Sequence, residues 1–183
     1  MENIKSFQSQ KVIKFLTIIF LGSILLTASA KFKIPFYPVP MTMQTFVVLF
    51  FGLAFGYKIG LSIVGLYLIE GILGLPVFSN SPERGVGLIY FTGPTMGYLI
   101  GFLFAVFLSG YLDLKKNIFI IFFKLLLSVS VIYILGLIWL GILIGWDKPI
   151  LELGAIPFLP AEFLKILILT LLTKKIIKLR SFI

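Results

Sequence analysis

The sequence predicts an all-α, polytopic membrane protein with six transmembrane helices. Of its 183 residues, 60% are hydrophobic and only 13% are charged, and the mean hydropathy is +1.13. Soluble domains are about half apolar and about a quarter charged. The apolar residues also form runs close to the length that crosses a bilayer as a helix. We expect one integral-membrane domain over residues 1–183, because no polar stretch is long enough for a separate soluble module.

The first predicted span covers residues 12–30 and has its most apolar part at 15–26, after a lysine-bearing start. Its Ala-Ser-Ala end at 28–30 resembles a signal-peptide cleavage site, and that alternative stays open. The nearly full length of the span and the spans that follow favour an uncleaved helix. Ser23 and Thr27 have a small-xxx-small spacing, which suits close packing either with a partner or within the same bundle.

The second and third spans are separated by a glycine-containing break. Residues 31–40 contain three prolines, so we expect an extended loop at the membrane surface there. The second span, 41–56, is short, at about 24 Å of helix. A break at 56–60 separates it from the third span, which ends at Gly74. Glycines four residues apart predict close helix packing in this region: Gly52, Gly56 and Gly60.

The fourth and fifth spans follow the most polar loop of the middle of the chain, at 75–93. The fourth span extends over 93–112. A short charged turn at 113–117 leads to the fifth span, 118–145, which is long enough to cross with tilt. A polar connection at 147–152 then leads to the last span.

The sixth span carries an acid and a base. Pro157 and Pro160 mark where its helix can begin, because proline suits a first turn. Glu162 and Lys165 are three residues apart and therefore share one helix face. A charged side chain deep in a bilayer costs at least about 2.5–3.5 kcal/mol, which makes this pair a candidate functional site. A purely structural ion pair is the alternative.

The distribution of positive charge predicts the orientation. Ten Lys and Arg residues lie in the two tails and in the second and fourth loops, against four in the other three loops. Cytoplasmic segments carry the excess of Lys and Arg, so we expect both termini in the cytoplasm. The loops at 31–40 and 75–93 would then meet the start of the sixth span on the outer face. The sequence therefore predicts a pocket open to the outside, with Glu162 and Lys165 in its wall.

Composition argues against several function classes. The chain has no histidine and no cysteine, which removes imidazole and thiol chemistry and most transition-metal sites. Its seven acidic residues show no spacing typical of a hydrolytic dyad or a divalent-metal cage. The net charge of +9 is explained by membrane topology, since there is no basic polar surface for nucleic acid. We expect no catalytic residues, no metal, no cofactor and no nucleic-acid partner. A membrane-embedded enzyme is the alternative from a different class.

Three motifs in order resemble the successive signatures of the BioY family, the biotin-binding S components of energy-coupling factor (ECF) transporters. They are PVPMTMQT at 38–45, GLPVF at 74–78 and GPTMGYL at 93–99. The resemblance covers nearly the whole chain and implies six helices and a biotin site near the outer face. The Asp-x-x-Lys of the family at the start of the last helix matches Glu162 and Lys165, with a side chain one methylene longer at the acid.

The chemistry of biotin agrees with this implied site. Its ureido ring has two N–H donors and one carbonyl acceptor, which Glu162, Lys165 and Asn80 can satisfy. Its thiophane ring and valeryl chain need apolar walls, and its carboxylate favours a cation, for which Arg84 is available. On this resemblance the candidate biotin-binding residues are Gln44, Asn80, Tyr90, Phe91, Tyr98, Glu162 and Lys165.

The resemblance also implies partners. S components of this family capture the vitamin with high affinity in the bacterial plasma membrane, and delivery into the cell requires a transmembrane coupling subunit and two ATPase subunits. No sequence pattern typical of a nucleotide site occurs in this chain. Ser23 and Thr27 align with the alanine-rich first helix that docks the coupling subunit. An S component for a different small vitamin is the alternative within this class.

Overall fold

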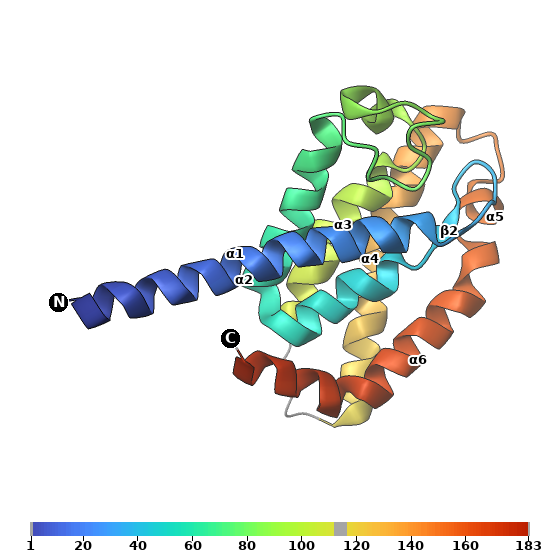
Figure 1. The fold of residues 1–183 in the computed structure, drawn as a ribbon. Helices are drawn as coiled ribbons and strands as arrows, with labels where there is room; N and C mark the ends of the chain where they lie inside the picture. The colour runs from blue at the N-terminus through green and yellow to red at the C-terminus, as the bar shows by residue number, and fades with distance from the viewer. Residues whose placement is uncertain (1, 112–116, 183) are drawn as a thin grey trace.

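The computed structural model describes residues 2–111 and 117–182 and is almost entirely helical (Figure 1). Within this described part, four helical stretches are long and apolar enough to cross a membrane. They are Gln10–Lys31, Gln44–Ile72, Ile118–Ile144 and Ile150–Arg180, and a shorter apolar helix covers Met96–Gly110. The all-α class predicted from the sequence is confirmed.

Helix α1, Glu2–Lys31, packs its C-terminal half against the rest of the bundle, while its N-terminal half projects away from it (Figure 1). The approach to α2 is close, because a Cβ atom on Gly22 would lie 2.7 Å from Ile63 Cδ1. At its end, Lys31 Nζ donates to Phe78 O at 2.7 Å and to Ser81 O at 2.9 Å. The C-terminal half of α1 is thus part of the bundle, and the predicted uncleaved helix stays a prediction.

The proline-rich loop after α1 is extended, as predicted, and it also forms a small sheet that was not predicted. Strands β1, Lys33–Ile34, and β2, Met41–Thr42, pair antiparallel, with Lys33 opposite Thr42. The prolines at 35, 38 and 40 lack an N–H donor and interrupt a ladder, and the pairing is confined to the two ends of the loop. The sheet holds Thr42 directly before the next helix.

Helix α2, Gln44–Ile72, is interrupted at Gly56, whose φ of 78° and ψ of 171° are not helical. It therefore consists of two helical segments, 44–55 and 57–72. The predicted break at 56–60 is present but is confined to Gly56, because residues 57–60 are helical. The first segment begins three residues later than expected, because Met41 and Thr42 belong to β2. Gly52 lets α2 cross α3 closely: a Cβ atom there would overlap Ser109 Oγ.

Helices α3, Met96–Gly110, and α4, Ile118–Ile144, follow a 3-10 helix at Gly87–Thr92. Helix α3 packs against both α2 and α4. The bounds of α4 agree with the predicted span, because Asn117 accepts a hydrogen bond from Phe119 N at 3.1 Å and Gly145, with φ of 95°, ends the helix. Apart from Asn117, the predicted charged turn at 113–117 lies outside the described residues.

The chain then forms α5, Ile150–Gly154, a 3-10 turn at Ile156–Phe158 and α6, Leu159–Ile176. The short helix α5, which was not predicted, includes the end of the predicted polar connection at 147–152. Pro160 lies in the first turn of α6, as the sequence predicted. Helix α6 packs against α2 and α4.

Arg180, in the closing 3-10 helix Ile177–Phe182, ties three elements together. Its Nε donates to Leu53 O at 2.9 Å, and its Nη2 donates to Gly52 O at 3.0 Å and to Gly110 O at 3.2 Å. A helix end leaves its last carbonyl groups without intrahelical partners. Arg180 donates to carbonyl groups that have no intrahelical partner because the first segment of α2 ends at the break at Gly56 and because α3 ends at Gly110.

Candidate ligand-binding site

A cavity lies where the β2–α2 junction meets α3, α4 and α6. It has about 520 Å³ of empty space, part of it open to solvent. A mostly apolar wall with a few polar groups is typical of small-molecule sites. The lining residues are Val39, Pro40, Met41, Thr42, Gln44, Thr45, Ser79, Tyr90, Thr95, Tyr98, Leu99, Phe102, Ile132, Tyr133, Phe158 and Glu162.

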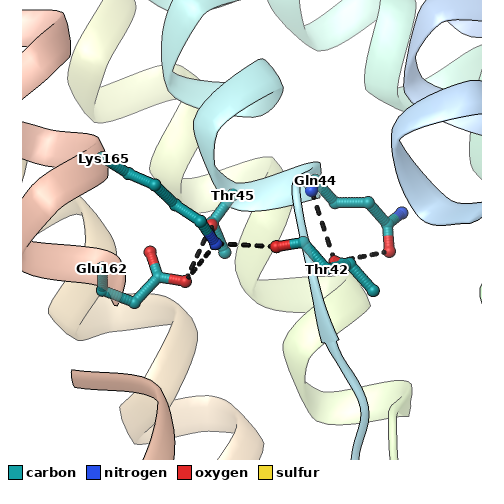
Figure 2. A network of polar contacts seen from close by, with 5 residues as sticks. All are labelled: Thr42, Gln44, Thr45, Glu162 and Lys165. Atoms are coloured by element: carbon teal, nitrogen blue, oxygen red, sulfur yellow. Dashed lines mark hydrogen bonds and ion pairs between the residues drawn. The ribbon is translucent and has the colours of Figure 1, made fainter. Parts of the chain in front are cut away.

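Glu162 and Lys165 form a buried ion pair at this cavity (Figure 2). Lys165 Nζ donates to Glu162 Oε1 at 2.8 Å, to Thr45 Oγ1 at 3.0 Å and to Thr42 O at 2.7 Å. The Thr45 hydroxyl in turn donates to Glu162 Oε1 at 2.9 Å. An ammonium group has three N–H donors, so those of Lys165 are all used within the protein. The pair carries no net charge.

The other carboxylate oxygen, Glu162 Oε2, has no hydrogen-bond partner. Glu162 is only 4% exposed, and among the described residues Oε2 is the buried side-chain polar atom that has no hydrogen-bond partner. Figure 2 shows this oxygen turned away from the ammonium group of Lys165. Leaving a buried polar group unpaired costs about 1–3 kcal/mol. The site therefore presents an acceptor that a bound N–H or O–H donor would satisfy.

Two distant segments build this site. Glu162 and Lys165 lie three residues apart near the start of α6 and point to one side of it (Figure 2). Thr42 lies at the end of β2 and Thr45 at the start of α2. Between them, the backbone N–H of Gln44 donates to Thr42 Oγ1 at 3.3 Å. The small sheet and the start of α2 thus hold the oxygen atoms that fix the ammonium group.

Three residues predicted from the sequence line the cavity with their polar atoms already bonded. Gln44 Nε2 donates to the Tyr67 hydroxyl at 2.8 Å. The Tyr98 hydroxyl donates to Gly154 O at 2.8 Å. The Tyr90 hydroxyl accepts from Asn80 N at 3.2 Å. Their rings and aliphatic parts form the wall, while the Gln44 amide and the two tyrosine hydroxyls bond it to neighbouring segments.

Three other predicted residues lie beside the cavity rather than in its lining. Asn80 lines a smaller adjoining cavity that shares Tyr90 with the main one, and Lys33 Nζ donates to Asn80 Oδ1 at 3.1 Å. Phe91 packs edge-on against Phe78, with ring centroids 5.3 Å apart. Lys165 is 7% exposed and lies behind Glu162, which it holds in place.

Cations from both sides link the loops at 31–40 and 75–93. From the loop at 31–40, Lys33 Nζ donates to Ser79 O at 2.7 Å. From the loop at 75–93, Arg84 Nη1 donates to Pro38 O at 2.7 Å, and its guanidinium lies 5.4 Å from the Tyr37 ring centroid. The structure thus brings together the two loops and the start of α6, the three segments predicted to converge. The Arg84 side chain is engaged with the first loop.

Several residues of the site were missed by the sequence reasoning. Thr42 and Thr45 lie within the motif at 38–45, but nothing local marks them as partners of Lys165. Tyr133 and Phe158 line the cavity between α4 and α6, and their rings are 6.4 Å apart. A hydroxyl group within a long apolar run was the one available signal for Tyr133.

The predicted docking residues of α1 differ in their placement. Ser23 is only 1% exposed and its hydroxyl donates to Glu70 Oε2. Thr27 is half-buried. Ser23 therefore faces its own bundle, and Glu70 is bonded to α1 rather than lining the cavity. A docking role for Ser23 and Thr27 stays a prediction.

Comparisons with known proteins give one consistent result. The model of the BioY family matches residues 2–182. The chain is 34% identical over 141 residues to a probable biotin transporter BioY of Pyrococcus horikoshii, covering 77% of this chain and 82% of that protein. It is 33% identical over 156 residues to the biotin transporter BioY of Thermotoga maritima, covering 85% and 90%. A crystal structure of the S-component for biotin from an ECF-type ABC transporter aligns with a TM-score of 0.76 and 26% identity, over 92% of this chain and 93% of that one.

Proposed function

The chain belongs to the BioY family, and we propose that it captures biotin as the substrate-specific S component of an ECF-type transporter. It is an integral membrane protein of the cell membrane and a transporter rather than an enzyme. The two relatives described above are named as biotin transporters, which favours biotin over another vitamin.

The unpaired Glu162 Oε2 is the observation that carries the proposed ligand contact. It is a buried acceptor in the wall of the cavity, and its partner oxygen is already held by Lys165 and Thr45. The ureido ring of biotin has two N–H donors, one of which would satisfy this oxygen. A hydrogen bond to a charged acceptor contributes about 1.5–3 kcal/mol.

The remaining candidates take supporting roles in this proposal. Tyr90 and Tyr98 present ring faces to the apolar parts of biotin, and Gln44 completes the wall between them. Asn80 Oδ1 is held by Lys33, so its amide N–H groups are the part that can donate to a ligand oxygen. Phe91 supports the wall indirectly: it packs on Phe78, which stacks on Tyr90 with ring centroids 4.6 Å apart.

Lys165 acts on the ligand mainly through Glu162 in this proposal. Its three donors are used by Glu162, Thr45 and Thr42. It compensates the buried carboxylate and fixes its orientation, so that Oε2 faces the ligand. A direct bond from Lys165 to biotin would require one of its three present bonds to be exchanged.

We propose that the protein has six membrane spans and that both termini are cytoplasmic. The break at Gly56 supports six spans, because it divides α2 into two helical segments beside α1, α3, α4 and α6. Arg180 supports the orientation, because it places the C-terminal segment at the end where α3 stops and α2 turns. Basic residues gather at that end, in agreement with the positive-inside rule.

Delivery of biotin into the cell would require a transmembrane coupling subunit and two ATPase subunits, which we propose as the partners. The alignment with an S-component of an ECF-type ABC transporter supports this assembly. The chain itself captures the vitamin in this scheme and hydrolyses no nucleotide.

Isothermal titration calorimetry of the purified protein with biotin tests this function. We expect one biotin per chain and, for Glu162→Gln, an affinity about ten- to 150-fold lower, which is the loss of one hydrogen bond to a charged group. Glu152→Gln, at an exposed acid in α5, is the matched control and should bind as the wild type does. Folded protein that binds no biotin, or that purifies with another vitamin, would contradict the proposal.

A further inference from the structure

A buried tyrosine behind the ligand cavity joins two of the segments that form its walls. Tyr67, in the second segment of α2, is completely buried, and the described lining of the cavity does not include it. Its hydroxyl accepts from Gln44 Nε2 at 2.8 Å and donates to Val77 O at 3.2 Å. Gln44 is part of the lining, whereas Val77 belongs to the loop at 75–93. One hydroxyl group therefore connects the start of α2 with that loop.

The wall on the Gln44 side leads to the acceptor proposed for the ligand. The Gln44 side chain extends away from the Glu162–Lys165 pair, and its Oε1 accepts from Thr42 Oγ1 at 3.3 Å (Figure 2). Thr42 O in turn accepts from Lys165 Nζ at 2.7 Å, and Lys165 holds Glu162. Both ends of the Gln44 amide group are thus bonded, one to Thr42 and the other to Tyr67. Bonded residues therefore link the Tyr67 hydroxyl to the carboxylate of Glu162.

The wall on the Val77 side consists of aromatic rings in contact with one another. The Tyr67 ring packs edge-on against Phe78, with ring centroids 5.3 Å apart. Phe78 stacks on Tyr90, which lines the cavity, with ring centroids 4.6 Å apart. The fit of Phe78 against α2 is close, because a Cβ atom on Gly71 would overlap its Cζ atom. Tyr67 thus holds this wall with its ring as well as with its hydroxyl.

We propose that Tyr67 is a positioning residue: its hydroxyl fixes the Gln44 wall relative to the Tyr90 wall, and this fixed spacing selects the rigid fused rings of biotin. This role rests on the proposed capture of biotin. A rigid ligand gains affinity from walls that are already in place, because binding then requires no ordering of the protein. A flexible ligand with the same head group adapts to small changes in the spacing and gains less from it. Tyr67 needs no contact with the ligand in this role.

Two ligands distinguish this role from a purely structural one. Desthiobiotin has the ureido ring and the carboxylate chain of biotin but lacks the thiophane ring, so it is more flexible. Tyr67→Phe keeps the ring and removes the hydroxyl. We expect this variant to bind biotin about five- to tenfold more weakly, because its walls must be ordered without the two hydrogen bonds, and to bind desthiobiotin at most about twofold more weakly. Isothermal titration calorimetry of the purified protein measures both affinities.

Tyr57→Phe is the matched control. Tyr57 lies on the same helix, α2, and packs edge-on against Phe107 with ring centroids 5.5 Å apart, as Tyr67 does against Phe78. The described lining of the cavity does not include Tyr57, so both affinities of this variant should equal those of the wild type. The ratio of the two affinities is the decisive quantity, because partial unfolding lowers the number of active sites for both ligands alike and leaves the ratio unchanged.

The outcomes separate the positioning role from the proposed function. Wild-type protein that binds no biotin contradicts the proposed function and, with it, this role. If the wild type binds biotin, a preference for biotin over desthiobiotin that falls less than about twofold in Tyr67→Phe overturns the positioning role alone. An equal fall in Tyr57→Phe, or the loss of both ligands in Tyr67→Phe, also overturns it, because the effect would then be a general one on the fold. A larger fall in Tyr67→Phe alone supports it.

Discussion

Replacing Lys165 by methionine should destabilise the fold and weaken biotin binding together. The change keeps most of the side-chain length but removes the ammonium group that donates to Glu162, Thr45 and Thr42. Removing one partner of a buried ion pair costs about 3–5 kcal/mol, because the other charge stays buried without compensation. Here Thr45 still donates to Glu162 Oε1 at 2.9 Å, so we expect a value near about 3 kcal/mol.

A double substitution separates the two effects. Glu162→Gln combined with Lys165→Met removes both charges, so no lone charge is left buried and most of the lost stability should return. Biotin affinity should not return, because the carboxylate acceptor is gone. Lys124→Met in α4 is the control, because this lysine is half-buried and has no acid three or four residues away on its helix. The stability of this variant should stay within about 0.5 kcal/mol of the wild type.

Unfolding in one detergent and calorimetric titration with biotin provide the measurements. For Lys165→Met we expect at least about tenfold weaker binding, because Glu162 loses the ammonium group that orients it and its hydrogen bond to biotin, which contributes about 1.5–3 kcal/mol, is weakened. A double variant no more stable than Lys165→Met would show that the cost is not an uncompensated carboxylate. Wild-type affinity in Lys165→Met would show that Lys165 does not position Glu162 for the ligand.

Two further predictions concern helix packing and are measured as the free energy of unfolding in thermal unfolding experiments. Gly52→Ala should lower that free energy by about 1–3 kcal/mol, because the added Cβ would overlap Ser109 Oγ. Its control, Gly65→Ala, has nothing within 4 Å of the added Cβ and should be neutral or stabilise by up to about 1 kcal/mol, so equal effects of the two changes would refute the close crossing of α2 and α3. Arg180→Gln should lower the free energy of unfolding by about 1.5–3 kcal/mol, because its hydrogen bonds to carbonyl groups are lost. Its control, Lys175→Gln at an exposed position, should change little, and a neutral Arg180→Gln would show that these bonds do not hold the helix ends.

The elements that sequence reasoning located correctly have local causes. Gly56 adopts a φ of 78°, which glycine tolerates, and the predicted break lies there. Asn117 and Gly145 bound α4 through a side-chain cap and a positive φ. Pro160 lies in the first turn of α6. Each of these signals acts within a few residues of the element it begins or ends, and so it can be read from a short window of sequence.

The candidate site was only partly predictable, because its remaining partners meet through tertiary packing. Glu162 and Lys165 stand out as charges in an apolar run, but the hydroxyl of Thr45 is 120 residues away from Lys165 along the chain. Nothing in the spacing shows that Lys165 uses all its donors within the protein. Ser23 is similar: its small size suits a docking face, yet its hydroxyl is bonded to Glu70, 47 residues later.

The neutrality of the Glu162–Lys165 pair has a consequence for the energetics of uptake. Moving one elementary charge through a membrane potential involves about 2.3 kcal/mol per 100 mV. Because the charges of the two side chains sum to zero, this pair contributes no net electrical work if the empty pocket changes sides. With biotin bound, the carboxylate of the ligand adds one negative charge to this neutral pair, and an inside-negative potential opposes the inward movement of that charge. That electrical work would have to come from the ATPase subunits of the proposed assembly.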